Sequence, residues 1–463
     1  MKPVNRITRP QRQGSVLILS LIFIAMFSAL AAAFAGMSGA NIQIAENHRK
    51  VDNARACAES GLEVIRFWMD KVEISSTTPH DQRFAQLTTD LQNKLTNAGV
   101  TNLIPTVISS TLAFSNVPIN SSLGQSFSAL LTQIDNNDIR VEVTGHYGSF
   151  HRTIRSAYRF GTRANTVFDF GVASRGPVSL AGNVELEGVN LQVESNAYIE
   201  SPNTLLALSI IGNSHIAGNV KIVNPLAMVH LQGGKAGIGG ETGAAAMNHV
   251  QIGVTPCEFP EMDPTAFIPY ATRVLTSSDS TSANATYENL KIPAGMNPSF
   301  SGNVTLKGVV FIEAPNVVTF SGGVDITGII VTNGDPTDNS ATNRLRFTGN
   351  VTGHPITQLP EDPKFAGLHS QTGTFIMAPG FQVGFGGSFT TLSGAIAANG
   401  IELWGNAGGT IHGSIVNYSD APMVLQGNTD LYFNRSGLEE VPAGFVPQLV
   451  LYYDPASYAE GVL

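Results

Sequence analysis

The sequence predicts two kinds of structure in one chain: an α+β N-terminal unit with one long helix and antiparallel strands, and a mainly-β region folded as a parallel β-helix. Three observations predict this. An apolar run near the N-terminus continues into a helical pattern. Two alternating segments about a Tyr-Gly turn indicate a β-hairpin. A Gly-Asn phrase recurs through the second half and supplies repeated corners and short strands.

Composition supports a β-rich chain of more than one unit. At 463 residues it exceeds the size of one core, so two or three units are expected. Charged residues make up 13%, whereas there are 47 glycines, a mixture that suits short strands and turns. The formal net charge is −9 and the cations beyond the first helix are dispersed. Because nucleic acids are bound through clustered cations, no nucleic-acid partner is expected.

The first element is an apolar segment preceded by a basic tail. No charge occurs between residues 16 and 34, which as a helix measure about 28 Å, enough to cross a membrane. The next charge is Glu46, so the basic N-terminus is expected to stay in the cytoplasm and the bulk of the chain to be exported. The basic residues before the apolar segment are Lys2, Arg6, Arg9 and Arg12.

Helical periodicity continues beyond the apolar segment. We expect one helix over residues 15–70, membrane-spanning at 16–35 and amphipathic at 36–70, roughly 80 Å long. The alternative is a membrane span followed by a separate amphipathic helix. Apolar or small residues keep a spacing of three or four at Ile44, Val51, Ala54, Ala58, Leu62, Ile65 and Met69.

A secretory signal peptide is a second interpretation of the opening. Ala33-Phe34-Ala35 before Gly36 has the small-x-small pattern of a signal cleavage site. The apolar segment is nevertheless longer than the usual signal core of about 7 to 15 residues.

Two motifs carry a resemblance to a known family. The junction "RPQRQGSVLILSL" resembles a type IV prepilin leader, which a peptidase cuts after the glycine. The following "ENHRKVDNARACAESGLEVIRFWM" is similar to the stretch after the anchor in PilX-like minor pilins, here with the run Ala58-Glu59-Ser60-Gly61-Leu62-Glu63. The resemblance implies a leader at residues 1–14, cleavage between Gly14 and Ser15, and assembly with other pilins through the helix.

One position departs from the pattern of major pilins. They carry a glutamate at the fifth mature position, which here is Leu19. A carboxylate in the bilayer needs a partner, and in the family it pairs with the terminal amine of a neighbouring subunit. PilX-like proteins and the tip subunit of type II secretion pseudopili also lack this glutamate. The resemblance to them favours a minor subunit.

Residues 71–168 are expected to form a small α+β head of the pilin type. Two amphipathic segments, near 82–95 and 125–134, are predicted as helices. The segment "DIRVEVTGHYGSFHRTIRSAYRF" alternates about Tyr147-Gly148 and predicts a β-hairpin that covers the helix. We interpret His146 and His151, which flank its turn, as strand residues and not as a metal pair.

From residue 169 to 463 we expect the β-helix, with an irregular excursion at 253–298 and the C-terminal tail as a cap. The repeated phrase is "AGNVELEG" at 181, "AGNVKIVN" at 217, "SGNVTLKG" at 301, "SGGVDITG" at 321, "TGNVTGHP" at 348 and "QGNTDLYF" at 426. Its spacing of 20 to 27 residues between Gly302, Gly322 and Gly349 fits one coil.

The asparagines of this phrase suggest a ladder. Stacked coils place equivalent residues about 4.8 Å apart. We therefore expect a hydrogen-bonded ladder formed by Asn183, Asn219, Asn303 and Asn350.

No catalytic, cofactor-binding or metal-binding residues are predicted. The ten histidines include no HExxH motif. Glu185 and Glu187 are a carboxylate pair of the kind a glycoside hydrolase needs, but we interpret them as residues of a solvated strand face. Cys57 and Cys257 are expected to be small buried residues, with a disulfide as the alternative.

We therefore expect a non-enzymatic minor pilin or pseudopilin of a type IV pilus or type II secretion-like filament. It would sit in the inner membrane and then in a pilus or at the cell surface, with the prepilin peptidase, other pilins and an unknown surface ligand as partners. It would display the β-helix for adhesion or tip priming. The alternatives are a membrane-anchored or secreted β-helical enzyme acting on polysaccharide and a structural envelope protein.

Overall fold

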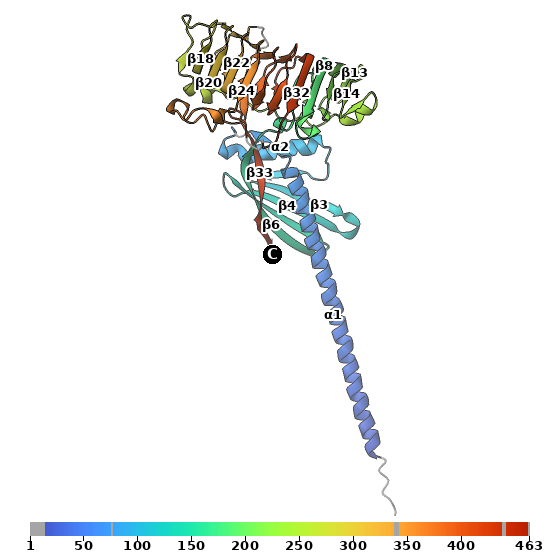
Figure 1. Ribbon diagram of the computed structural model, residues 1–463. Helices are drawn as coiled ribbons and strands as arrows, with labels where there is room; N and C mark the ends of the chain where they lie inside the picture. The colour runs from blue at the N-terminus through green and yellow to red at the C-terminus, as the bar shows by residue number, and fades with distance from the viewer. Residues whose placement is uncertain (1–13, 76, 338–341, 438–440, 462–463) are drawn as a thin grey trace, which may run out of the picture. The chain divides into compact units, whose positions relative to one another are not determined.

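The computed structural model describes residues 14–75, 77–337, 342–437 and 441–461 (Figure 1). The chain divides into two compact units. The first comprises Met1–Val72, Pro79–Phe160 and Leu451–Leu463, and the second Glu73–Thr78 and Gly161–Val450. Each unit is therefore assembled from stretches that are separated in sequence.

The first unit is built on one helix, α1 (Gly14–Met69), which is continuous over 56 residues. The alternative of two separate helices is therefore wrong. A short 3-10 turn, η1 (His80–Gln82), precedes a second helix, α2 (Arg83–Asn97). α2 is amphipathic and buries one face, formed by Phe84, Leu87, Thr88, Leu91 and Leu95.

Seven strands form the sheet associated with this unit, in the order β1-β33-β6-β5-β4-β3-β2. From β6 to β2 all neighbouring pairs are antiparallel. A 3-10 turn, η2 (Ser121–Leu123), joins β3 to β4. The strands are β1 (Ile74–Ser75), β2 (Pro105–Ile108), β3 (Thr111–Asn120), β4 (Gln125–Gln133), β5 (Asp138–Tyr147), β6 (Phe150–Arg163) and β33 (Gln448–Gly461).

The predicted hairpin is present, and one predicted helix is not. β5 and β6 pair from Asp138↔Arg159 to Tyr147↔Phe150, as the alternating pattern indicated. Residues 125–134, predicted as a helix, instead contain strand β4. Its buried residues follow a period of two at Phe127, Ala129 and Leu131, which is a strand pattern that a short amphipathic segment does not reveal by itself.

The C-terminal tail does not cap the repeats, contrary to the expectation from the sequence. β33 lies beside β6 and pairs antiparallel with β1, and residues from Leu451 onward belong to the first unit. The tail is fastened there by Ser457 Oγ, which accepts from the Ala157 amide at 2.6 Å, and by an ion pair of 2.7 Å between Arg55 and Glu460. An unpaired β6 edge would leave its backbone groups open to other chains, which explains why the tail pairs with it.

The second unit is mostly β, with two sheets of parallel strands. Among the described strand pairs of these two sheets, only β14 and β15 are antiparallel. The 14-stranded sheet comprises β8 (Val178–Gly188), β10 (Leu206–Gly212), β11 (His215–Ile216), β13 (Met228–Gln232), β14 (Gly237–Ile238), β15 (Glu241–Thr242), β19 (Ser299–Phe300), β21 (Val317–Phe320), β23 (Arg344–Phe347), β26 (Gln382–Phe385), β27 (Thr391–Ser393), β29 (Ile401–Leu403), β30 (Gly409–His412) and β32 (Met423–Phe433).

The 12-stranded sheet is formed by strands that lie between those of the 14-stranded sheet along the chain. It comprises β7 (Val172–Ser174), β9 (Ala197–Ile199), β12 (Val220–Ile222), β16 (Val250–Ile252), β17 (Arg273–Val274), β18 (Ala285–Ile292), β20 (Val304–Ile312), β22 (Val324–Thr332), β24 (Val351–His354), β25 (Thr374–Ala378), β28 (Ala395–Ala398) and β31 (Ile415–Asn417). Short 3-10 turns lie between them: η3 (Thr166–Asp169), η4 (Gln192–Ser195), η5 (Ala245–His249), η6 (Pro264–Tyr270), η7 (Ile356–Gln358) and η8 (Pro363–Phe365).

Strand order in these sheets is not chain order. The 12-stranded sheet runs β16-β12-β9-β7-β31-β28-β25-β22-β20-β18-β17, so the chain begins in the middle at β7 and works outward to β16. It then resumes at the opposite end with β17 and returns to the middle, where β31 pairs with β7 and β32 with β8. The first and last strands of this unit therefore meet at a central seam.

The segment that links the two ends is shorter than the expected excursion of 253–298. It extends from the end of β16 to the start of β17, whereas residues 285–292 form β18 inside the sheet and bury Tyr287, Leu290 and Ile292. Phe259 and Phe267 of the link belong to a second apolar cluster, with Phe311 and Val331 from the 12-stranded sheet. The link thus covers apolar side chains that do not belong to the main core.

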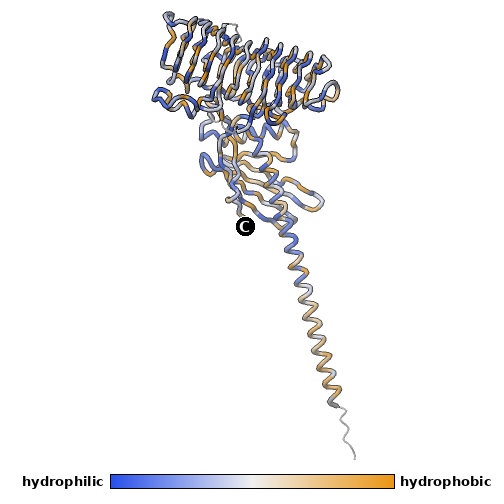
Figure 2. The backbone as a smooth tube through the Cα atoms, viewed as in Figure 1, coloured by the Kyte–Doolittle hydropathy of each residue, from blue (hydrophilic) through white to orange (hydrophobic). Residues whose placement is uncertain are grey.

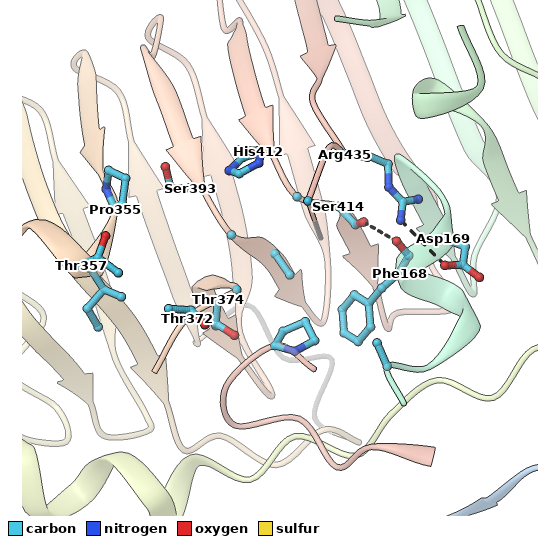
Figure 3. Close-up of a pocket in the computed structure, with 18 residues that line it drawn as sticks. Phe168, Asp169, Pro355, Thr357, Thr372, Thr374, Ser393, His412, Ser414 and Arg435 are labelled. Atoms are coloured by element: carbon cyan, nitrogen blue, oxygen red, sulfur yellow. Dashed lines mark hydrogen bonds and ion pairs between the residues drawn. The ribbon is translucent and has the colours of Figure 1, made fainter. Parts of the chain in front are cut away.

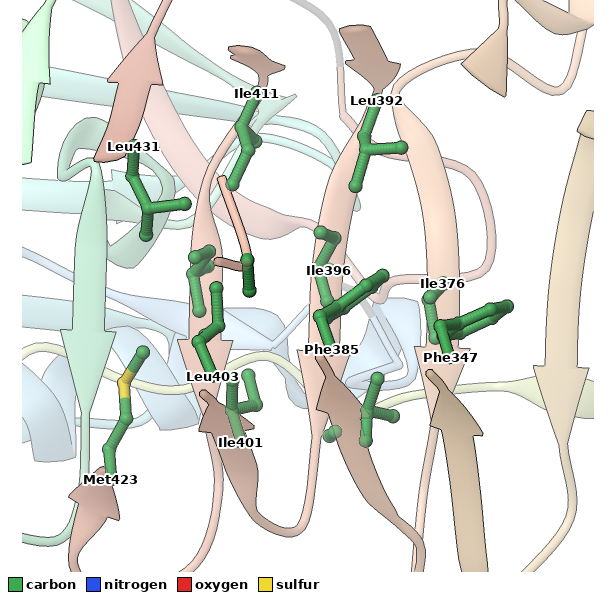
Figure 4. Close-up of a cluster of buried hydrophobic side chains, with 14 of the residues drawn as sticks. Phe347, Ile376, Phe385, Leu392, Ile396, Ile401, Leu403, Ile411, Met423 and Leu431 are labelled. Atoms are coloured by element: carbon green, nitrogen blue, oxygen red, sulfur yellow. The ribbon is translucent and has the colours of Figure 1, made fainter. Parts of the chain in front are cut away.

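The main core lies in the second unit and contains a stack of aromatic rings. Neighbouring centroids of Phe300, Phe320, Phe347 and Phe385 are 4.9, 5.3 and 5.0 Å apart, with nearly parallel rings. Figure 4 shows Phe347 and Phe385 among the surrounding aliphatic side chains. The same column continues through the seam, by strand register, as Leu403, Leu425, Leu180 and Ile210.

Candidate functional site

The first candidate site is the N-terminal half of α1. Residues 16–49 are exposed throughout, although they include large apolar side chains such as Val16, Phe23 and Phe34. Figure 2 shows this half of the helix as predominantly apolar. In the described part of the chain, the helix from Val16 to Met69 is the single one long and apolar enough to cross a membrane. This N-terminal helix is therefore able to anchor the chain in a membrane.

The C-terminal half of α1 rests on the antiparallel sheet at two glycines. A Cβ at Gly145 of β5 would lie 2.2 Å from the Ala54 carbonyl oxygen and from the Ala58 amide nitrogen of the helix. A Cβ at Gly61 of the helix would lie 2.5 Å from the Phe127 ring of β4. The two backbones approach each other closely at Gly145, and the Phe127 side chain fills the space beside Gly61, so neither glycine leaves room for a side chain.

The family-like run Ala58–Glu63 divides between this contact and solvent. Ala58, Gly61 and Leu62 are buried, whereas Glu59, Ser60 and Glu63 are exposed. Glu59 pairs with Arg55 at 3.0 Å along the helix. The apolar members of the motif therefore position the helix, and the acidic members face outward.

The predicted cleavage site lies at the start of the described chain. Residues 1–13 of the predicted leader lie outside the described residues, and α1 begins at Gly14, followed by Ser15. Leu19, at the position of the pilin glutamate, is 59% exposed within the apolar half of the helix. An apolar side chain at this position leaves the segment around it free of charge.

A pocket of about 290 Å³ in the second unit is the second candidate site (Figure 3). It lies where three chain corners, Thr372-Gly373-Thr374, Ser393-Gly394-Ala395 and His412-Gly413-Ser414, follow one another across the sheet. Phe168, Ile356 and Pro442 add apolar walls. The pocket therefore combines apolar surface with hydroxyl groups and one imidazole.

Glycine at the centre of these corners permits their close stacking beside the pocket. A Cβ at Gly394, whose φ is +125°, would lie 2.5 Å from the Thr374 carbonyl carbon, and one at Gly413 would lie 2.5 Å from Gly394. Larger residues would push the stacked corners apart. Glycines recur about every 20 residues at positions 373, 394 and 413, and this spacing, which the prediction from the Gly-Asn phrase did not use, is the signal that the sequence offers for the stacked corners.

Charge in the pocket comes from Arg435 and Asp169. Their closest atoms, Arg435 Nη2 and Asp169 Oδ1, are 3.9 Å apart, too far for a hydrogen bond. Arg435 Nε is buried and has no hydrogen-bond partner among the described residues. Burial lowers the pKa of Arg435, although Asp169 and Glu194 act in the opposite direction. The guanidinium thus keeps unused donors beside the cavity.

Glu194 fixes the chain at Arg435. One carboxylate oxygen accepts from the Arg435 amide at 2.9 Å, and the other accepts from the amides of Asn190 and Leu191 at 2.6 and 3.1 Å. Burial by itself would raise the pKa of Glu194, but these hydrogen bonds and one from the Asn190 side chain outweigh it and lower the pKa to about 2. The carboxylate is therefore ionised at neutral pH.

The predicted carboxylate pair lies elsewhere, on a half-exposed strand face. Glu185 and Glu187 of β8 adjoin His215 of β11, and one possible ligand atom from each lies within 4.8 Å of the others. His215 Nε2 is 3.3 Å from Glu187 Oε1. The acidic pair and the pocket are formed by different residues.

The predicted asparagine ladder has other members than expected. Asn183 belongs to a ladder in the 14-stranded sheet, in which side-chain amides are linked in the order Asn213, Asn183, Asn428 and Asn406. Asn219, Asn303 and Asn350 instead precede strands of the 12-stranded sheet. The single four-residue ladder is thus wrong, because the Gly-Asn phrase occurs at two different corners.

At the corners that precede strands of the 12-stranded sheet, asparagine side-chain oxygens take part in hydrogen bonds between neighbouring turns of the chain. The Asn219 backbone amide donates to Asn196 Oδ1 at 2.8 Å, and Asn219 Oδ1 lies 2.8 Å from His249 Nδ1. The Gly323 backbone amide donates to Asn303 Oδ1 at 3.0 Å. Asn350 Oδ1 accepts from Ser388 Oγ. Each of these bonds joins the corners beside two neighbouring strands, so these asparagines stabilise the stacking of the corners.

The histidines and cysteines singled out in the sequence lie on the β5–β6 hairpin, on α1 and on the link after β16. His146 and His151 face each other across the β5–β6 hairpin, with ring centroids 6.5 Å apart. Burial and the neighbouring His151 lower the pKa of His146. Cys57 is buried, Cys257 is half-buried, and both are free thiols.

Comparisons with known proteins give few matches. No family model and no curated protein matches the sequence. Among solved structures, a competence-associated pilin, ComZ of Thermus thermophilus, matches with 10% identity and a TM-score of 0.29, covering 89% of this chain and 98% of that one. A glycosylated ice-binding protein from an Arctic yeast matches with 11% identity and a TM-score of 0.19, covering 58% and 93%. TM-scores below 0.5 do not establish a shared fold.

Proposed function

We propose that this protein is a minor pilin or pseudopilin, of the PilX-like kind, in a type IV pilus or a type II secretion-like filament. The observation that carries the proposal is the division of α1. Its N-terminal half exposes an uncharged and mainly apolar surface, and its C-terminal half packs on a sheet at Gly145 and Gly61. A helix of this kind serves both as a membrane anchor and as a surface that packs against equivalent helices.

Assembly in this proposal begins with removal of the leader after Gly14 by the prepilin peptidase. The mature helix stays in the inner membrane until it is taken into the filament by contact with the helices of other pilins. Leu19 supports a minor role, at the tip or in initiation, since it gives a neighbouring terminal amine no carboxylate to pair with.

The second unit is the displayed part of the molecule in this proposal. Its two parallel sheets would be the faces of a parallel β-helix, exposed on a pilus or at the cell surface for adhesion or tip priming. The continuous apolar column through the seam and the ladders at the corners support a rigid module of this kind. Its pocket is a site for a surface ligand.

We propose a non-enzymatic role for this module. Among its described lining residues the pocket has one carboxylate, Asp169, whereas glycoside hydrolysis ordinarily uses two. Glu185 and Glu187 lie on a strand face outside the pocket lining. An enzyme acting on polysaccharide is the competing proposal, and a structural envelope protein that never joins a filament is the third.

The mature N-terminus tests the main proposal. The full-length protein is expressed in a bacterial host with and without a prepilin peptidase, and its N-terminal peptide is identified by mass spectrometry. We expect a start at Ser15 only when the peptidase is present. Gly14→Val should block this processing, because the leaders that this junction resembles are cut after a glycine.

The matched control is Ala35→Leu, which destroys the alternative signal cleavage site and should leave processing at Ser15 unchanged. A start at Gly36 that is lost in the Ala35→Leu variant would contradict the pilin proposal and leave a secreted protein. Chemical crosslinking in the same cells then tests contact with other pilins. A protein that starts at Ser15 but does not crosslink to other pilins would favour the structural envelope protein.

A further inference from the structure

The corner pocket has the size of a small polar ligand. Its volume of about 290 Å³ is just below the range for small-molecule sites, about 300 to 1,000 Å³. One sugar ring fits this space, whereas a nucleotide or a peptide would extend well beyond it. The described lining has one guanidinium and no cluster of cations, which argues against a phosphate-bearing ligand.

Hydroxyl groups around the pocket are available for hydrogen bonds. Ser393 Oγ and Thr357 Oγ1 line the cavity and make no hydrogen bond to the described residues, and Figure 3 shows both side chains at its edge. The Ser414 and Thr374 hydroxyls are committed, since they donate to the backbone oxygens of Phe168 and Ala443 at 3.1 and 2.7 Å. Ser393 and Thr357 are thus the hydroxyls that a ligand can use.

Asp169 and Arg435 supply an acceptor and a donor side by side. Because their atoms are 3.9 Å apart, neither satisfies the other by a hydrogen bond. The Asp169 side chain is 74% exposed, whereas that of Arg435 is only 14% exposed and has its unpaired Nε buried. A carboxylate next to a guanidinium matches adjacent hydroxyls that donate to one and accept from the other.

Apolar surface completes the arrangement. Phe168, Ile356 and Pro442 line the cavity with carbon atoms. The cavity therefore has apolar surface as well as free hydroxyl groups. A sugar ring has both properties, with polar hydroxyls at its edge and C–H groups on its faces. A purely apolar ligand would leave the Arg435 and Asp169 groups without partners, at a cost in free energy.

We infer that this pocket binds a neutral saccharide unit of hexose size, held by Asp169, Arg435 and Ser393. A saccharide would be the ligand of the displayed unit, so its biological setting rests on the proposed function. Binding itself depends only on residues of the second unit. It can therefore succeed or fail whichever way the N-terminus is processed.

The test is ligand-observed NMR on the full-length protein in a detergent without sugar groups. The probes are glucose, galactose, mannose and N-acetylglucosamine, each titrated into the protein, with Asp169→Asn and Ser393→Leu as pocket variants. Asp169→Asn removes the charge from an exposed side chain, and Ser393→Leu fills the cavity. Glu402→Gln, which changes an exposed acid outside the pocket lining, is the matched control.

We expect at least one sugar to show saturation transfer, at least a tenfold weaker affinity in both pocket variants, and no change in the control. Binding by none of the four sugars would overturn the inference. So would binding that both folded pocket variants retain, because the sugar would then be held elsewhere. Circular dichroism of each variant verifies that the strands are intact.

Discussion

Asn183 donates a hydrogen bond of 2.9 Å to Asn428, although 245 residues separate them in the chain. The two residues lie opposite each other where β8 meets β32, and this pairing extends from Val178↔Met423 to Gly188↔Phe433. The seam closes the second unit by joining its first and last long strands. Its strength therefore determines whether the parallel sheets are continuous.

Leu431→Ala should weaken this seam more than Asn428→Ala does, which removes one amide of the surface ladder. Leu431 is fully buried and pairs in register with Leu186. Removing its side chain should cost about 2–5 kcal/mol, whereas Asn428→Ala, at an exposed amide, should cost about 1 kcal/mol or less. Hydrogen exchange of the β8 and β32 amides measures both. Equal effects of the two substitutions would show that the seam is not held by its core.

Phe320→Ala should destabilise the second unit by about 3–5 kcal/mol. Its ring stacks between Phe300 and Phe347 and is 1% exposed, so truncation leaves a cavity in the middle of the column. Phe320→Leu should recover much of this loss, because leucine occupies equivalent positions of the column beyond Phe385. Urea unfolding followed by hydrogen exchange compares the two. Equal losses would mean that the column needs aromatic stacking and not merely volume.

Gly145→Ala should disturb the seat of α1 on the sheet. The added Cβ would lie 2.2 Å from backbone atoms of Ala54 and Ala58, and neither backbone atom is free to move like a side-chain end. We expect a loss of about 3 kcal/mol, at the upper end of overpacking effects. Gly148→Ala is the control. It also acquires an unfavourable conformation, with φ +60°, but has no neighbour within 4 Å, and should cost about 1–2 kcal/mol. Protease resistance of the first unit ranks the variants.

The stability of the second unit should depend on pH through Glu194. Its pKa of about 2 lies below the ordinary value of 4.5, so its contribution is fully present above about pH 4.5 and is lost as the pH falls toward 2. Glu194→Gln should cost about 1–3 kcal/mol at neutral pH, because charge-assisted bonds to three amides are weakened. The gap between the wild type and this variant, measured by unfolding at pH values from about 7 down to about 2, should shrink over the acidic range. A gap that stays constant would show that the carboxylate charge contributes nothing.

Several parts of the fold were predictable because their signals are local. The uncharged run at residues 16–34 and the spacing from Val51 to Met69 encode α1, and the alternation about Tyr147 encodes the β5–β6 hairpin. The Gly-Asn phrase located short strands in the second unit. Segment 125–134 misled the prediction because so short a segment fits an amphipathic helix and a strand almost equally.

The candidate pocket was not predicted, although its glycines are visible in the sequence. Gly373, Gly394 and Gly413 recur at similar intervals, but only the tertiary structure shows that they line one pocket with Arg435 and Phe168. Arg435 and Asp169 are far apart in the chain and carry no motif. A charge pair of this kind is recognised only after the strands have been placed in register.

The sequence by itself determined α1 and the β5–β6 hairpin, including which of their faces are buried, since hydrophobic period is a property of neighbouring residues. Tertiary structure alone decided which strands pair. In the tertiary structure β32 pairs with β8, and β33 belongs to the antiparallel sheet. The asparagines of the Gly-Asn phrase lie at two different corners. The physical reason is that a parallel ladder is formed by backbone groups, which are nearly the same in every residue. The choice among partners therefore depends on the packing of side chains such as Phe320, Leu425 and Leu180 between distant segments.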